Sequence, residues 1–338
     1  MNIDVTMDSN AEPETSATDV EVSGPRPHST LWYEDGNIVL AADVYLYRVH
    51  KSILSKHSTV LKDMFQLCSE GEGEPKDSAE SASDAEQYEG VPIVRMVNDS
   101  DDDVYYFLAT LYEHNFFRTH MYTKLSFLKS LAYMCTKYDA HKVRDDLVDH
   151  LSQIYPNTLS AYDDIMASKK FKSTRVDRDF HLLAIAKQID ARIVLPTVFY
   201  ACATQPLSVI MQSSSIIEQG DYDTIISGRE KITKHSYKVA TLLLLPEKKC
   251  QRRNTECEIL RTSSLLNYVD FKTDEPPPFP LQAPSDGALP EARADLCKAC
   301  VKNYLNSLKS SRKSFWDRLP SFFDLEDWNE LRQPESKT

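Results

Sequence analysis

The chain has 338 residues, of which 41% are apolar and 27% are charged, and its formal net charge is −12. These values are ordinary for one large or two modest globular domains, and the acidic balance disfavours general binding to nucleic-acid phosphates. No apolar run reaches the length of about 18 residues that a membrane span needs, so no membrane association is expected.

The first segment, residues 1–30, is acidic and polar and has almost no large apolar side chains. Such a segment cannot bury enough surface to offset the entropy of ordering, so we predict that residues 1–30 are disordered. The segment also lacks the basic start and apolar stretch of a signal peptide, which indicates the cytoplasm, the nucleus or both. In those compartments the seven cysteines are expected to be reduced.

Two short strands are predicted over residues 37–40 and 44–49, because apolar residues there are bounded by turn signals. A helix is predicted over 51–67, where apolar residues recur at helical spacing. Residues 69–90 carry eight acidic side chains and a single lysine. This composition predicts a flexible acidic loop.

A strand over 91–97 follows, and the acids between Asn98 and Asp103 suit the positive start of a helix. Two more helices are predicted over 122–138 and 141–154. Pro156 then interrupts the pattern and indicates a domain edge.

Residues 154–246 show helical patterns only. The last region, 247–338, contains two cysteine pairs, a proline-rich stretch, a helix predicted over 293–318 and an aromatic tail. The tail either packs on the chain's own helices, which we favour, or forms a surface for a partner. Its aromatic residues are Phe315, Trp316, Phe322, Phe323 and Trp328.

The block from Asp43 to Phe65 contains an Asp-hydrophobic strand, an aromatic residue, the pair His50-Lys51, the aliphatic pair Ile53-Leu54, a serine and a closing phenylalanine. This block resembles the signature of BTB/POZ domains, and the later strand and helices fit the same family over about residues 31–153. The whole chain is similar to a large group of fungal BTB proteins. In that group a Glu-Gly-Val-Pro strand start, here residues 89–92, and a Leu-Pro-Ser-Phe-Phe-like tail, here residues 319–323, recur.

The resemblance implies an α+β fold, in which a small mixed sheet covered by helices forms a BTB/POZ domain over residues 31–153. An all-α region similar to the BACK extension follows over 154–246, and a Cys-containing helical region ends the chain. The family forms two-fold dimers through apolar surface, for which Trp32, Tyr33, Met64 and Phe65 are candidates. The alternative is that these side chains fill the monomer core, and for Phe65 we favour the core.

The expected function is therefore a non-enzymatic protein-interaction module that forms a homodimer and recruits other proteins. One form is an adaptor for a cullin ubiquitin ligase, although no substrate-reading repeat follows the helices. The alternative is a nuclear corepressor-like regulator, for which the basic run Lys248–Arg253 could be an import signal or only a solvated face. The chain has no phosphate-binding loop, zinc-protease or serine-hydrolase motif, so no catalytic residues are expected.

Four cysteines lie in the last region, as the pairs Cys250-x6-Cys257 and Cys297-x2-Cys300. Because a Cys-x2-Cys pair can place two thiolates on one metal and Zn²⁺ prefers four ligands, we predict a structural zinc site. Ordinary buried thiols remain an alternative, as does a redox pair at Cys297 and Cys300, which lacks a thioredoxin-like strand context.

Overall fold

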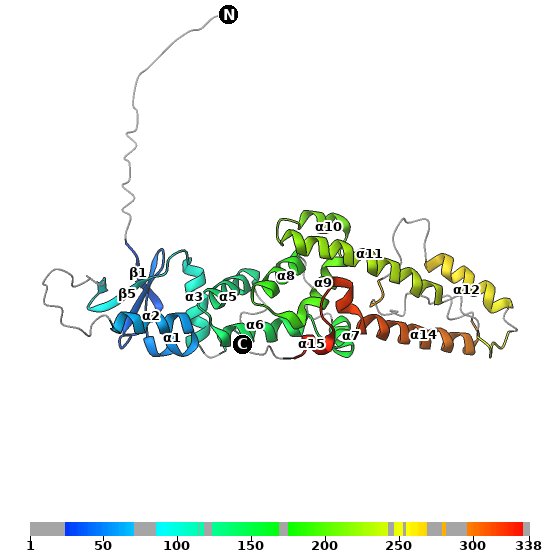
Figure 1. Cartoon of the computed structure of the whole chain (residues 1–338), viewed down its shortest axis with the longest axis horizontal. Helices are drawn as coiled ribbons and strands as arrows, with labels where there is room; N and C mark the ends of the chain where they lie inside the picture. Colours follow the sequence, from blue (N-terminus) through cyan, green and yellow to red (C-terminus); the bar gives the residue numbers. More distant parts are fainter. Residues whose placement is uncertain are drawn as a thin grey trace, which may run out of the picture. The chain divides into compact units, whose positions relative to one another are not determined.

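The computed structural model describes residues 24–70, 86–113, 115–117, 124–168, 175–242, 247–252, 255–268, 279–281 and 296–333. Two compact units divide the chain. Figure 1 shows their strands and helices, coloured along the sequence. One lies within Met1–Lys51 and Asp77–Asp101 and holds the strands, and the other holds nearly all of the helices. The predicted α+β class is confirmed. The expected boundary near Pro156 lies inside the helical unit.

The sheet has five strands in the order β1-β3-β2-β5-β4. Antiparallel pairs join β2 to β3 and β4 to β5, whereas β1 runs parallel to β3 and β5 parallel to β2. All four side chains of the central strand β2 are buried, which explains its uninterrupted apolar sequence. The bounds are β1 (Arg26–Trp32), β2 (Ile38–Ala41), β3 (Tyr45–Val49), β4 (Gln87–Tyr88) and β5 (Val91–Arg95).

The first strand begins at Arg26, so the disorder expected for residues 1–30 is corrected for residues 26–30. β1 is the edge strand beside β3, and most of its side chains are exposed. An exposed edge strand needs no apolar alternation and tolerates Pro27, which is why residues 26–30 show no strand pattern in the sequence. Residues 1–23 lie outside the described ranges.

The end of the acidic segment is also ordered, because β4 lies within the loop expected over 69–90 and pairs with β5. The Tyr88 ring meets Trp32 edge-on with centroids 5.7 Å apart. Both rings pack on the buried cluster of Val39, Ala41 and Leu46. Apolar packing thus orders the end of a segment whose composition indicates a loop. Residues 71–85 lie outside the described ranges.

The helix predicted over 51–67 is two helices, α1 (Lys51–His57) and α2 (Thr59–Glu70). Ser58 separates them and is 2% exposed. Its Oγ accepts the N–H of Leu61 at 3.0 Å and donates to the carbonyl of Tyr138 at 2.5 Å. A serine that satisfies a free N–H group at a helix start is a capping residue, so α2 begins there.

The remaining helices follow the predicted order, and α6 matches its predicted range. None of the helices in the described ranges combines the length and apolar character needed to cross a bilayer. The bounds are α3 (Asp101–Tyr112), α5 (Leu125–Lys137), α6 (His141–Ile154), α7 (Leu159–Ser168), α8 (Arg178–Gln188), η1 (Arg192–Val194), α9 (Leu195–Ala203), α10 (Leu207–Gln212), α11 (Gln219–Thr241), α12 (Thr255–Tyr268), α14 (Lys298–Asp317), η3 (Leu319–Phe323) and α15 (Trp328–Leu331).

The aromatic tail packs on the helical unit, as the favoured interpretation predicted. All five of its aromatic side chains are at most 6% exposed. The rings of Trp316 and Trp328 stack with centroids 5.4 Å apart, and the indole N–H of Trp328 donates to the carbonyl of Trp316 at 2.8 Å. Asp327 caps α15 through a capping box with Glu330. The tail therefore completes the core of this unit.

Candidate metal centre

Two segments bring the four predicted cysteines together. Cys250 lies in a turn closed by its N–H bond to the carbonyl of Glu247 at 3.0 Å, and Cys257 is on the first turn of α12. Cys297 is the N-cap residue of α14, and Cys300 lies one turn further on. The Cys-x2-Cys spacing therefore places both sulfurs at the same end of one helix.

The sulfur atoms of these residues all lie within 4.8 Å of one another. Sγ of Cys250 and Sγ of Cys297 are 3.8 Å apart. A tetrahedral zinc ion with Zn–S bonds of about 2.3 Å requires sulfurs separated by about 3.8 Å. A disulfide requires about 2.05 Å, and all four cysteines are free thiols. The spacing thus fits a shared metal and not a covalent bridge.

Burial isolates the cluster from water. Cys257, Cys297 and Cys300 are at most 6% exposed, and Cys250 is half-buried. Leu296 belongs to the same buried cluster. Buried sulfur in an apolar surrounding retains a metal well, because water and competing ligands have little access to it.

Hydrogen bonds also point at the sulfurs. The N–H of Cys297 donates to Sγ of Cys257 at 3.5 Å. The guanidinium of Arg261 donates from Nη1 to Sγ of Cys300 at 3.4 Å. Four thiolates around one divalent ion would have a net negative charge. Hydrogen-bond donors that face the sulfurs would stabilise this charge.

Arg261 is only 5% exposed, although arginine is seldom buried without a negative partner. Within the described ranges its Nε atom has no hydrogen-bond partner. The sequence prediction missed this residue. Its spacing could have indicated it, because Arg261 follows Cys257 by four residues and so lies on the same face of α12.

The thiols differ in acidity. Burial raises the pKa of Cys297, but N–H groups of Cys300 and Gln251 and neighbouring thiols donate to its sulfur and lower the pKa to about 6. Burial and hydrogen bonds with Cys297 and Cys250 raise the pKa of Cys300 to about 12. Burial also raises the pKa of Cys257. Without a metal, the cluster therefore concentrates negative charge on Cys297.

The predicted interface residues lie in both units. Trp32 is half-buried against the sheet cluster, and the Tyr33 ring lies 5.4 Å from that of His50. Met64 is half-buried on α2, whereas Phe65 is 6% exposed. Phe65 therefore fills the core of its unit and offers little surface to a partner.

The sequence matches no family model, and no curated protein or solved structure is significantly similar to the chain. The function is therefore inferred from the geometry of the described residues.

Proposed function

We propose that this chain is a non-enzymatic protein-interaction scaffold whose C-terminal helices are joined by a structural Zn²⁺ ion. The ligands are Cys250, Cys257, Cys297 and Cys300, and the observation that supports them is the gathering of four sulfurs within 4.8 Å. Four protein ligands leave no open position for a substrate, which is typical of structural zinc and not of catalytic zinc.

The chemistry of the donor set also favours zinc. Thiolates prefer soft or borderline metals, so Ca²⁺ and Mg²⁺ are excluded as the native ion. Bound to four sulfurs, the ion would tie the Cys250 turn and α12 to the start of α14. A redox role for Cys297 and Cys300 is less favoured, because a third and a fourth thiol also lie within 4.8 Å of them.

Metal analysis of the full chain, purified in reducing buffer without added metal, tests this site. We expect about one zinc per chain, and a loss of that zinc in Cys257→Ser and in Cys297→Ser. Cys135→Ser is the matched control, because it removes a buried thiol that is not part of the cluster. Stoichiometric zinc in none of these proteins, or equal zinc in all of them, contradicts the proposal.

The interaction function is supported by a separate surface on α2. Val60 and Leu67 are 42% and 71% exposed, and Met64 lies between them at helical spacing. Exposed apolar residues at i, i+4 and i+7 form one stripe along a helix. A second copy of the chain could cover such a stripe, since a two-fold interface pairs the same patch on both subunits.

The order of elements supports the BTB/POZ resemblance that motivates this dimer. After β1, a strand hairpin is followed by two helices, the short strand β4, a strand parallel to the first strand of the hairpin, and then further helices. Apart from β1, β4 and the division of the helix predicted over 51–67, these elements follow the order expected along the chain. We therefore propose a BTB/POZ-like domain that dimerises through the α2 stripe.

Sedimentation or light scattering of the full chain tests the dimer. We expect a dimer for the natural sequence and a monomer for the double variant Val60→Glu with Leu67→Glu. Met166→Glu serves as the control, because Met166 is also an exposed apolar residue, 53% exposed, but lies on α7. A monomeric natural chain, or a variant that still dimerises, argues against this interface.

Two forms of scaffold remain as proposals, an adaptor for a cullin ubiquitin ligase and a nuclear corepressor-like regulator. Co-purification with a cullin favours the adaptor. The regulator requires nuclear enrichment that depends on the basic run, in which Lys248, Lys249 and Arg252 are exposed. Replacing these three residues with glutamine and comparing the cellular distribution separates the two forms.

A further inference from the structure

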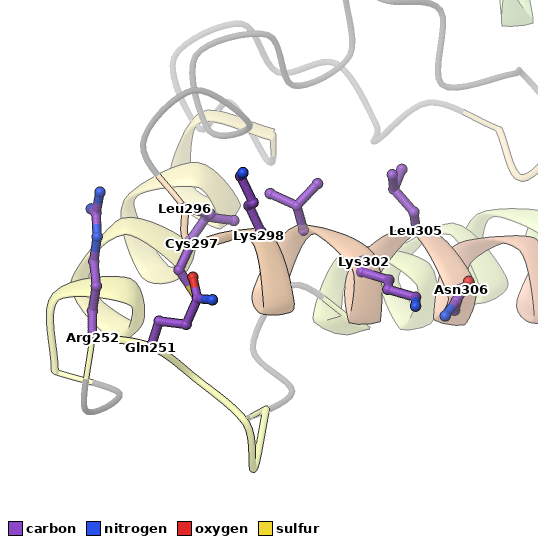
Figure 2. Close-up of a pocket in the computed structure, with 9 residues that line it drawn as sticks. Gln251, Arg252, Leu296, Cys297, Lys298, Lys302, Leu305 and Asn306 are labelled. Carbon is purple, nitrogen blue, oxygen red and sulfur yellow. The ribbon is translucent and has the colours of Figure 1, made fainter.

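A pocket of about 710 Å³ lies beside the metal centre, between the first half of α14 and the turn at Gln251 and Arg252 (Figure 2). Its lining residues on α14 include Lys298, Val301, Lys302 and Leu305. Successive positions in this set are three, one and three residues apart. This spacing places all four side chains on one face of the helix. The pocket is therefore a groove along α14.

The groove gathers cationic side chains although the chain is acidic. Arg252, Lys298 and Lys302 line it, and no lining residue carries a carboxylate. Cys297, a proposed zinc ligand, also lines the groove at the start of α14. Within the described ranges neither Lys298 nor Lys302 forms an ion pair, whereas Arg252 has a contact of 3.8 Å with the exposed carboxylate of Glu256. Lys298 is also the first residue of α14, where the positive end of the helix dipole adds to its charge.

The groove also offers apolar surface. Leu296 is buried at one end, Val301 is half-buried, and Leu305 is 36% exposed. Aliphatic and cationic side chains thus alternate along the same helix face. An exposed stripe that is both aliphatic and basic is complementary to a helix that is both aliphatic and acidic.

We propose that this groove binds an acidic amphipathic helix of another protein. Carboxylates of that helix would lie against Lys298 and Lys302, and its aliphatic side chains would cover Val301 and Leu305. This proposal names the kind of partner that the chain would bind, and it rests on the interaction function proposed above. The groove and the α2 stripe share no residue, so loss of peptide binding and loss of the dimer are measured separately.

Nucleic acid fits the groove less well. Single strands bind through aromatic side chains that stack on bases, and no lining residue is aromatic. The net charge of −12 also repels an extended phosphate backbone, whereas a short acidic helix would meet only the local basic surface.

Fluorescence anisotropy with the full chain tests the proposal. The probe is a fluorescein-labelled helical peptide of about 16 residues with leucine on one face and glutamate beside it, long enough to span about four turns. We expect binding that weakens with salt, and affinity about tenfold lower for the double variant Lys298→Glu with Lys302→Glu. Lys309→Glu is the control, because Lys309 is an exposed lysine of α14 that does not line the groove.

Any one of four results overturns the proposal. The first is no binding of the acidic peptide at concentrations up to about 1 mM, which corresponds to about −4 kcal/mol. The second is equal binding of a peptide in which every glutamate is glutamine, and the third is unchanged affinity in the double variant. The fourth is tighter binding of a single-stranded oligonucleotide than of the peptide. Circular dichroism and zinc content of each variant confirm that the helices and the metal centre are intact.

Discussion

The ring of Phe323 lies directly over Gly228, so closely that a Cβ atom at Gly228 would meet Cδ1 of Phe323 at 2.5 Å and Cε1 closer still. Gly228 is on α11, and Phe323 ends the η3 turn of the aromatic tail. Phe323 also stacks on Phe199 with ring centroids 5.4 Å apart. Any side chain at Gly228 would therefore push a buried ring into a second one.

We expect Gly228→Ala to lower the free energy of unfolding by about 1–3 kcal/mol, because it overpacks this contact. Urea denaturation measures the change. Gly220→Ala is the matched control on the same helix, since nothing lies within 4 Å of its Cβ position. The control should be neutral or up to about 1 kcal/mol more stable, because alanine favours the helix. Equal effects of the two substitutions would show that Phe323 does not constrain Gly228.

Trp328 anchors the end of the tail. Replacing it with alanine removes the stack on Trp316 and a buried donor, so we expect about 3–5 kcal/mol less stability. Thermal unfolding of the full chain tests this loss. Asn329→Ala, at the exposed neighbouring position, should leave the melting temperature nearly unchanged. An unchanged melting temperature for Trp328→Ala would point instead to a surface for a partner.

His150 makes the helical unit sensitive to acid. It is 1% exposed, and burial, with a smaller contribution from Arg178, lowers its pKa to about 4. The unfolded chain takes up a proton near pH 6.5, and the folded chain does so only near pH 4, so stability falls as the pH falls through this window. The loss should be about 2 kcal/mol between about pH 7 and pH 5.

Denaturation at several pH values tests this dependence, with His150→Gln as the comparison because glutamine does not titrate. The variant should be less stable overall but should lose less stability between the two pH values. The same pH slope in both proteins would mean that His150 is not the group responsible.

Zinc binding should release protons. At about pH 7.5 the thiols of Cys257 and Cys300 are protonated in the metal-free chain, because the pKa of each is raised, and each must lose its proton to bind zinc. Cys297, with a pKa of about 6, is already mostly a thiolate. We therefore expect at least two protons per zinc, measured by calorimetry in buffers of different ionisation enthalpy. Zinc affinity should rise with pH, and release of fewer than one proton would contradict this assignment.

Arg261 should strengthen the metal centre without being a ligand. Arg261→Met keeps an unbranched buried side chain but removes the charge that faces Sγ of Cys300. We expect this substitution to weaken zinc affinity about tenfold. Substitutions of residues that hydrogen-bond to metal ligands typically weaken metal affinity by about 10-fold to 100-fold. Competition with a chromogenic chelator measures it. Arg252→Met, which removes an exposed arginine near the same centre, should have little effect.

Local sequence patterns were enough to predict the class of the fold and the four cysteines that gather at one site. Helical periodicity predicted α6 over its observed range, and two pairs of cysteines predicted a shared site, because both are local patterns in which spacing decides geometry. Residues whose structure depends on distant partners were not predictable in this way. β1 is polar and is held by pairing with β3, and Ser58, which caps α2, donates to the carbonyl of Tyr138, which is distant along the chain.

The meeting of the two cysteine pairs, the burial of an arginine beside them and the need for glycine at position 228 became evident from tertiary packing. Each depends on contacts between segments that are separated by many residues, and local spacing does not specify such contacts. Local spacing therefore predicted the elements and the cysteine pairs, whereas packing between distant elements decided their environment.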